Sequence, residues 1–195
     1  MAHSADALLA TLHRTAIIGA VHERLKPDSH DERKESLLGE PDPEVTRDLR
    51  LMRCALDEAV RAAEQGEVPV GAVVARGEEI LATAHNERET TKDPTAHAEL
   101  LALRRAATSA GTWRLTGCTL YATLEPCPMC AGALHAARIS RLVYATPDPK
   151  AGAAGTLYDF PTDSRLNHTY PYTRGILQSE AAVLLQIFFK QRRGR

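Results

Sequence analysis

Apolar side chains recur every three or four positions along residues 43–65, a spacing that predicts one long amphipathic helix facing a core. Asp42 followed by Pro43 is typical of a helix start, because proline is favoured at the first helical position, and Gly66 marks the end. The apolar stripe of this predicted helix comprises Val45, Leu49, Met52, Leu56, Ala59, Val60 and Ala63.

Short, mostly apolar runs follow and predict strands. Val68–Ala75 indicates a buried strand, and Arg76-Gly77-Glu78 indicates a turn into a returning antiparallel strand over Glu79–His85. Two more β-type runs cover Thr119–Leu124 and Arg141–Ala145, with a possible fifth strand near residues 170–173.

Helical segments alternate with these strands. Asp93-Pro94-Thr95 is a helix-start signal, so we expect a helix to about Ser109 with His97 near its first turn. Further helices are expected over Pro128–Ala137 and Ile176–Gln191. This alternation predicts a three-layer α/β/α sandwich around a mixed five-stranded sheet.

Composition limits the number of cores. A chain of 195 residues with 44% apolar content suits one domain, which we expect over residues 44–195. Residues 1–43 are interpreted as an N-terminal extension, with a possible helix over Leu8–Leu25 and a charged, linker-like segment over Lys26–Glu40. The sequence has neither an apolar run of membrane-spanning length nor a secretory signal, so we expect a soluble, cytoplasmic protein.

The formal net charge of −1 is unevenly distributed: residues 1–50 carry −3 and residues 51–195 carry +2. Basic side chains gather at the end of the chain, at Lys190, Arg192, Arg193 and Arg195. Such an ending would attract a phosphate backbone, but it is equally consistent with a solubilising terminus.

Two short clusters thirty positions apart carry the candidate chemistry. His97-Ala98-Glu99 and Cys127-Pro128-Met129-Cys130 together supply one imidazole, two thiols and a carboxylate. Imidazole nitrogen and thiolate sulfur are preferred zinc ligands, and three protein ligands leave the fourth tetrahedral position open, as in catalytic zinc sites. Glu99 is placed to move protons beside such a site.

Other interpretations of the cysteine pair are a redox motif or a closed structural zinc site. A closed site needs a fourth ligand, yet Cys54 and Cys118 have no ligand-type partner nearby in the sequence. His135, five positions after Cys130, could be that ligand only if the helix geometry allowed it. The joint pattern therefore favours catalysis.

Residues 146–169 form a stretch without clear periodicity. Loops of this length in compact domains are usually functional or disordered. The small residues Gly152 to Gly155 would let a partner approach the backbone closely, so the loop suits substrate recognition as well as a flexible insertion.

At this point the residues resemble a known family, the bacterial tRNA-specific adenosine deaminases of the cytidine and deoxycytidylate deaminase superfamily. Zinc deaminases are recognised by a His-x-Glu and a Pro-Cys-x-x-Cys signature. The resemblance extends beyond that signature over about residues 44–195, in the segments VPVGAVV, DPTAHAE, TLEPCPMCAGAL and FFKQRR and in the loop after Asp148.

The resemblance implies a cytidine deaminase-like fold, a homodimer and hydrolytic conversion of adenosine to inosine at the wobble position of tRNA anticodons. It implies one zinc ion per subunit on His97, Cys127 and Cys130, with Glu99 as the proton shuttle. Contacts to the base and the anticodon nucleotides would come from Asn86, Asp148, Lys150 and Phe188 or Phe189.

Two other functions remain open at this stage. A guanine or cytosine-type deaminase of free bases or nucleosides shares the zinc signature. A non-catalytic RNA-binding subunit would use zinc only as a structural ion, but it would be expected to lack Glu99, which this chain retains.

Overall fold

The computed structural model describes residues 42–193. The helix expected over Leu8–Leu25 and the charged segment after it lie outside these described residues. Of the basic ending, Lys190, Arg192 and Arg193 are described.

The first described helix, α2 (Pro43–Glu64), begins as its sequence predicts. The Asp42 side chain accepts a hydrogen bond from the Glu44 amide at 2.8 Å, and Pro43 occupies the first helical position, where its missing N–H is not needed. Leu51, Met52 and Ala55 are completely buried on its inner face.

The sheet contains five strands in the order β2-β1-β3-β4-β5. Its strands are β1 (Gly71–Arg76), β2 (Glu79–His85), β3 (Thr119–Leu124), β4 (Arg141–Thr146) and β5 (Tyr172–Arg174). β1 pairs antiparallel with both β2 and β3, whereas β3, β4 and β5 run parallel to one another. The predicted mixed five-stranded sheet is confirmed.

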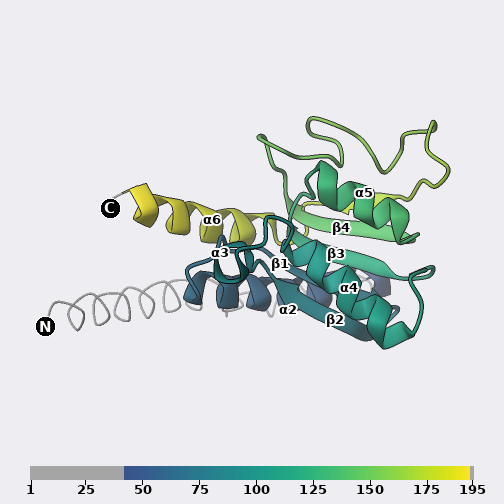
Figure 1. Cartoon of the computed structure of the whole chain (residues 1–195), viewed down its shortest axis with the longest axis horizontal. Coiled ribbons are helices and arrows are strands. Elements are labelled where there is room, and N and C mark those ends of the chain that lie inside the picture. The colour runs from purple at the N-terminus through teal and green to yellow at the C-terminus, as the bar shows by residue number, and fades with distance from the viewer. Residues whose placement is uncertain (1–41, 194–195) are drawn as a thin grey trace, which may run out of the picture.

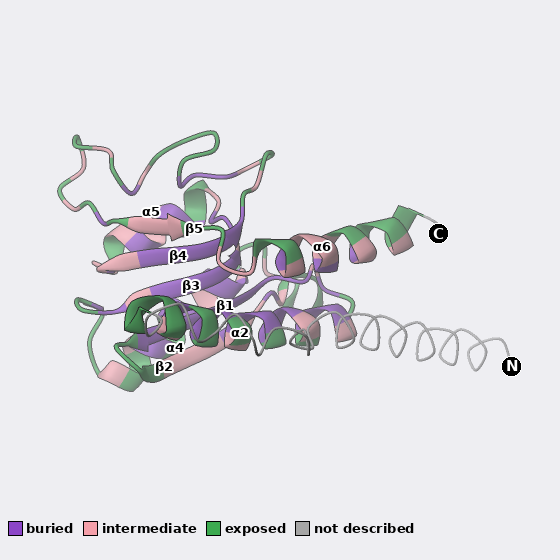
Figure 2. Ribbon diagram, turned by 180° about the vertical axis from the view of Figure 1, so that it is seen from behind, coloured by how far each residue is buried: buried purple, intermediate pink, exposed green. Residues whose placement is uncertain are grey.

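Helices cover both faces of this sheet (Figure 1). Alternate residues of β3 point to opposite sides: Leu120 and Ala122 pack with α4 (Ala98–Ala110) and α5 (Pro128–Ala136), whereas Tyr121 packs with α2 and the start of α6 (Gln178–Arg193). Figure 2 shows the central strands largely buried and the outer turns of α6 mostly exposed. This arrangement is the predicted three-layer α/β/α sandwich.

A glycine allows α2 to lie close against the sheet. A Cβ atom on Gly71 would lie 2.0 Å from the Ala55 carbonyl oxygen and 2.6 Å from the Ala59 nitrogen. Neither backbone atom can move without disturbing the helix, so this position needs glycine.

Several element boundaries differ from the sequence prediction. β1 begins at Gly71 rather than Val68, because Pro69 has no N–H for the ladder and the Val70 N–H donates to the Val68 carbonyl at 2.8 Å. A short helix, α3 (Arg88–Thr91), was not predicted, and it ends at Lys92 in a left-handed conformation. His97 is the N-cap residue of α4 and so precedes its first turn. Within the described residues, no helix has the length and apolar character needed to cross a membrane.

Candidate active site

The parallel pairing of β3 and β4 brings their carboxyl ends to one edge of the sheet, where the candidate metal ligands meet. His97 is the N-cap of α4, Cys127 is the N-cap of α5, and Cys130 lies in the first turn of α5. His97 Nδ1 lies 3.8 Å from Cys127 Sγ and 3.6 Å from Cys130 Sγ. The starts of two helices thus bring together three ligand atoms from distant parts of the sequence.

These separations fit zinc. Tetrahedral ligands at about 2.1 Å for nitrogen and about 2.3 Å for sulfur lie about 3.6 Å from one another. All three ligand atoms lie within 4.8 Å of one another, and within the described residues they form the one His, Cys, Asp or Glu group that could hold a metal ion. Two thiolates and one imidazole are a zinc-type donor set, so zinc is the cofactor that this site accommodates.

The two cysteines are chemically unequal. A hydrogen bond from Cys130 lowers the pKa of Cys127 to about 4, and the same interaction raises the pKa of Cys130. Both sulfurs lie at the amino end of α5, where the helix dipole favours negative charge. Cys127 is therefore a thiolate at neutral pH and ready to bind a metal.

Glu99 lies beside the three ligands without belonging to their group. It occupies the second position of α4 and is only 3% exposed. Desolvation by burial raises the pKa of its carboxyl group. A carboxyl group that exchanges a proton more readily near neutral pH suits a proton shuttle.

A cavity of about 590 Å³ opens above these residues. Its wall combines His97 and Cys127 with apolar side chains from the segment before β1, from α6 and from the loop after β4. This composition is typical of sites for small organic groups. The lining residues are Val68, Val70, Asn86, Arg88, His97, Ala98, Glu99, Leu124, Glu125, Cys127, Thr146, Pro147, Asp148, Pro149, Lys150, Ala151, Ala182, Leu185, Gln186 and Phe189.

Asn86, Asp148 and Lys150, all named from the sequence, line this cavity together with Glu99 and two of the metal ligands, His97 and Cys127. Asn86 follows β2 directly and is 5% exposed. Asp148 is half-buried and accepts a hydrogen bond from the Lys150 amide at 2.9 Å, while Lys150 is exposed.

The two adjacent phenylalanines of α6 have different environments. Phe189 lines the cavity and is 43% exposed, whereas Phe188 is 7% exposed and does not line it. The Arg192 guanidinium lies 5.5 Å from the centre of the Phe188 ring. The aromatic wall of the cavity is therefore Phe189, and Phe188 belongs to the packing of the helix.

His135 does not complete the metal site. Its Nδ1 lies 3.0 Å from the His168 carbonyl oxygen, and it is not part of the ligand group. Within the described residues, the group that could hold a metal therefore has three side chains, which would leave the fourth tetrahedral position open.

Sequence reasoning missed Glu125, which connects β3 to the loop after β4. Its carboxylate is 1% exposed and accepts backbone N–H groups from Asp148 at 3.0 Å, Ala154 at 2.8 Å and Thr156 at 3.1 Å, and also the Thr156 hydroxyl. An acidic residue immediately before Pro126 and the first cysteine was the available signal. Arg88, on the unpredicted helix α3, is a second missed residue of the cavity wall.

Comparisons with known proteins agree with this geometry. A family model described as "Cytidine and deoxycytidylate deaminase zinc-binding region" matches residues 45–146. The chain is 46% identical over 149 residues to the tRNA-specific adenosine deaminase of Bacillus subtilis, covering 76% of this chain and 92% of the relative. It is also 46% identical to the enzyme of that name from Haemophilus influenzae, over 75% of this chain and 85% of the relative.

A solved structure from a study of A-to-I editing by tRNA deaminases at the wobble position superposes with a TM-score of 0.68 at 41% identity. The match covers 70% of this chain and 99% of that one. This chain therefore belongs to the cytidine and deoxycytidylate deaminase superfamily, in the group of bacterial tRNA-specific adenosine deaminases.

Proposed function

We propose that this protein hydrolytically deaminates adenosine to inosine at the wobble position of tRNA anticodons. One observation carries the proposal: the three residues that could hold zinc and the buried carboxyl group of Glu99 lie together at one cavity. The similarity to named tRNA-specific adenosine deaminases supports this substrate.

His97, Cys127 and Cys130 would hold the zinc ion. When bound there, zinc supplies an activated water as the nucleophile at neutral pH. Water adds to C6 of adenine, and ammonia leaves from the same carbon.

Glu99 moves the protons of this reaction. It takes a proton from the attacking water and delivers it to N1 of the adenine ring, which makes C6 more electrophilic. It then takes the remaining proton from the hydroxyl group now bound to C6 and delivers it to the amino group, which leaves as ammonia while the C6 carbonyl of inosine forms. Burial supports this cycle, because a desolvated carboxyl group gains and releases a proton closer to neutral pH than an exposed one.

The cavity wall provides contacts for a nucleotide that has left its stack. Asn86 would hydrogen-bond the inserted nucleoside, Phe189 would offer an aromatic face, and Asp148 and Lys150 would contact neighbouring nucleotides. A base in an anticodon loop is already largely unstacked, so its insertion costs less than extraction from a duplex.

Thiolate ligands suit the reducing cytoplasm, where tRNA is available. The family resemblance also supports a homodimer. Equilibrium sedimentation of the full chain tests the assembly: a mass of two chains supports the homodimer, and a mass of one chain contradicts it.

The substrate is tested by measuring ammonia release from three compounds side by side: a hairpin of anticodon sequence with a wobble adenosine, free guanine and cytidine. The matched control hairpin carries guanosine at the wobble position. Turnover confined to the adenosine hairpin supports the proposal, whereas preferential turnover of guanine or cytidine would replace it with a free-base or nucleoside deaminase. Absence of ammonia from all three in the zinc-loaded protein would favour a non-catalytic RNA-binding subunit.

A further inference from the structure

Glu67 is a buried acidic residue beside the cavity to which the chemistry above gives no role. It lies between α2 and β1 and is 0% exposed. Its Oε1 accepts the Thr90 backbone N–H at 2.6 Å, and its Oε2 accepts from Asn86 Nδ2 at 3.0 Å. Within the described residues it makes no ion pair with a lysine, arginine or histidine.

The direction of the second hydrogen bond determines the orientation of the Asn86 amide. A carboxylate only accepts hydrogen bonds, so Asn86 must turn its NH₂ group toward Glu67 and its carbonyl oxygen away from it. In the described part of the chain no donor contacts Asn86 Oδ1, yet no buried side-chain oxygen or nitrogen there lacks a partner. Oδ1 is therefore accessible, and the accessible space beside Asn86 is the cavity.

The backbone around Asn86 leaves little freedom for another arrangement. The Asn86 N–H donates to the Val70 carbonyl at 3.0 Å, and the next N–H, of Glu87, donates to the Ala96 carbonyl at 3.0 Å. Thr90, the second partner of Glu67, lies on α3, which also carries the cavity residue Arg88. One carboxylate thus connects two parts of the cavity wall.

We infer that Glu67 is a positioning residue that makes Asn86 present a hydrogen-bond acceptor, and not a donor, to the substrate. This inference rests on the proposed function. It specifies which group of the substrate is recognised: the Asn86 carbonyl oxygen would accept a hydrogen bond from an N–H or O–H donor of the nucleoside. In adenosine such donors are the exocyclic amino group and the ribose hydroxyls.

The Glu67→Gln variant tests the orientation. The new glutamine can still accept from Thr90 with its oxygen, but it then directs its NH₂ group toward Asn86. Asn86 would respond by rotating its amide, which retains a hydrogen bond and turns an NH₂ group into the cavity. We expect a loss in kcat/KM on the adenosine hairpin of about tenfold or more, with zinc content and Tm close to those of the unaltered protein.

A double variant, Glu67→Gln with Asn86→Asp, separates orientation from a merely structural role. The new glutamine then donates to the new aspartate, whose other oxygen faces the cavity as an acceptor again. We expect this double variant to recover most of the activity lost in E67Q. The single variant Asn86→Asp is the matched control, because it places two carboxylates against each other and should remain impaired.

The source of the donor is distinguished by a hairpin with 2′-deoxyadenosine at the wobble position. If E67Q reduces activity on this hairpin by the same factor as on the ribose hairpin, the amino group is the donor. If the effect of E67Q disappears there, the donor is the 2′-hydroxyl.

The inference is overturned if E67Q deaminates the ribose hairpin as well as the unaltered protein does, or if the double variant folds and is no more active than E67Q. If E67Q does not fold, a folded and active double variant supports the inference, and an inactive one contradicts it. Failure of the proposed function gives a different result, since the unaltered protein would then release no ammonia from the adenosine hairpin.

Discussion

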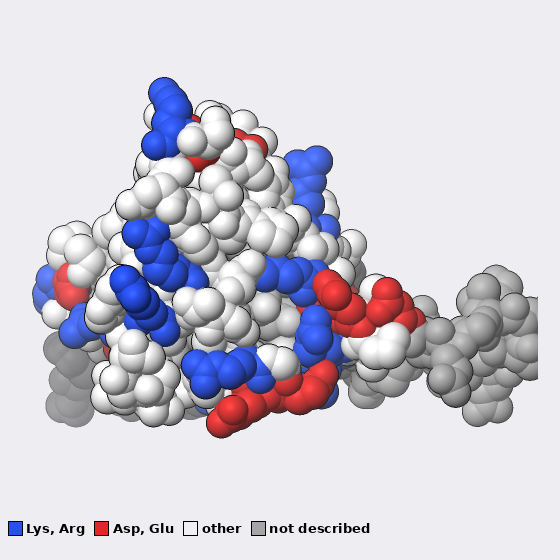
Figure 3. All heavy atoms as spheres, turned by 90° about the vertical axis from the view of Figure 1, so that its right-hand side faces the viewer, with Lys and Arg blue, Asp and Glu red and all other residues white. Residues whose placement is uncertain are grey.

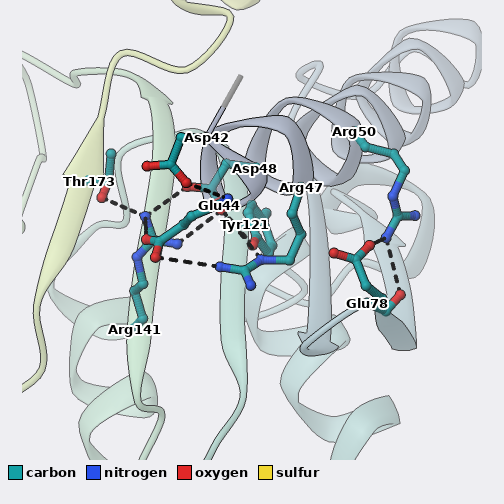
Figure 4. Close-up of polar contacts among 9 residues, drawn as sticks. All are labelled: Asp42, Glu44, Arg47, Asp48, Arg50, Glu78, Tyr121, Arg141 and Thr173. Atoms are coloured by element: carbon teal, nitrogen blue, oxygen red, sulfur yellow. Dashed lines mark hydrogen bonds and ion pairs between the residues drawn. The ribbon is translucent and has the colours of Figure 1, made fainter. Parts of the chain in front are cut away.

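Buried carboxylates at the two ends of the parallel strands β3 and β4 have different partners: a cation at the amino ends, and uncharged donors at the carboxyl ends. At their amino ends, Asp48 of α2 accepts two hydrogen bonds from the Arg141 guanidinium, at 2.9 and 2.7 Å, and one from the Tyr121 hydroxyl at 2.8 Å. Arg141 also donates to Thr173 at 2.8 Å and pairs with Glu44 at 3.0 Å, so this network joins α2 to three strands (Figure 4).

The surface around that network carries positively and negatively charged side chains. Figure 3, which shows the molecule from this end, has Lys and Arg side chains next to Asp and Glu side chains. One further pair there links Arg50 of α2 to Glu78 in the turn between β1 and β2. This end of the molecule uses opposite charges to attach a helix to the sheet.

At the carboxyl ends, buried acidic side chains are held without cations. Glu67 accepts from amide donors, and Glu125 accepts from backbone N–H groups and one hydroxyl. Within the described residues, neither these two nor Glu99 forms an ion pair. Burial raises the pKa of Glu99, and no lysine or arginine of the described residues pairs with it to oppose that effect.

The largest effect is expected from Glu99→Ala, with the isosteric Glu99→Gln alongside it. Since a positioned general acid and base contributes about 10²–10⁴-fold, we expect deamination of the hairpin to fall by at least that factor. Zinc content should stay at one ion per chain, because Glu99 is not a ligand. Ammonia assays and metal analysis of the purified variants provide the check. Substantial residual turnover, or loss of zinc from a folded variant, would contradict this role.

Breaking the network at the amino ends should instead reduce stability. Arg141→Met leaves Asp48 buried without its cation, and we expect a loss of about 3 kcal/mol in the free energy of unfolding. The kcat of the molecules that remain folded should not change, because Arg141 begins β4 and the cavity lies at the end of β4. Denaturant unfolding and steady-state kinetics measure the two quantities.

The double variant Asp48→Leu with Arg141→Met is the control for that prediction, since it removes both charges and should recover part of the lost stability. A large fall in kcat at temperatures where Arg141→Met is folded would show that the two ends are coupled.

Glu125→Gln should affect the loop after β4 with a smaller consequence. Its carboxylate oxygens face donors only, so an NH₂ group in place of one oxygen would oppose an N–H of Asp148 or of Ala154. We expect KM for the hairpin to rise by about tenfold, with zinc content unchanged. A variant with unaltered KM would indicate that the loop is held by its other contacts, such as the hydrogen bond from Tyr144 to the Ala154 carbonyl.

The smallest effect is expected from Lys150→Ala, on the exposed side of the cavity. Loss of one phosphate contact should weaken hairpin binding and reduce the slope of log affinity against log salt by about 0.7. Fluorescence anisotropy with a labelled hairpin, measured across a salt series, gives this slope. An unchanged slope for Lys150→Ala would remove this residue from the RNA contacts.

Much of the fold was predictable because it depends on local patterns. Helix α2, strands β3 and β4 and helix α5 lie within a residue of their predicted bounds, since proline, glycine and apolar periodicity act over a few positions. The predicted start of β1 was wrong because it included Pro69, which has no N–H for the ladder. Helix α3 was missed because four residues provide no period.

The sequence by itself determined the chemistry of this protein. The spacing of His97 and Glu99 and of Cys127 and Cys130 specifies a metal, an open coordination position and a carboxyl group, because ligand preference belongs to the side chains themselves. Only the tertiary structure showed which further acidic residues are buried beside the cavity and which groups they hold. Glu67, Glu99 and Glu125 are the same residue type, and they differ in the donors that surround each one after folding. The same holds for Phe188 and Phe189, because only the folded chain shows which ring is buried and which lines the cavity.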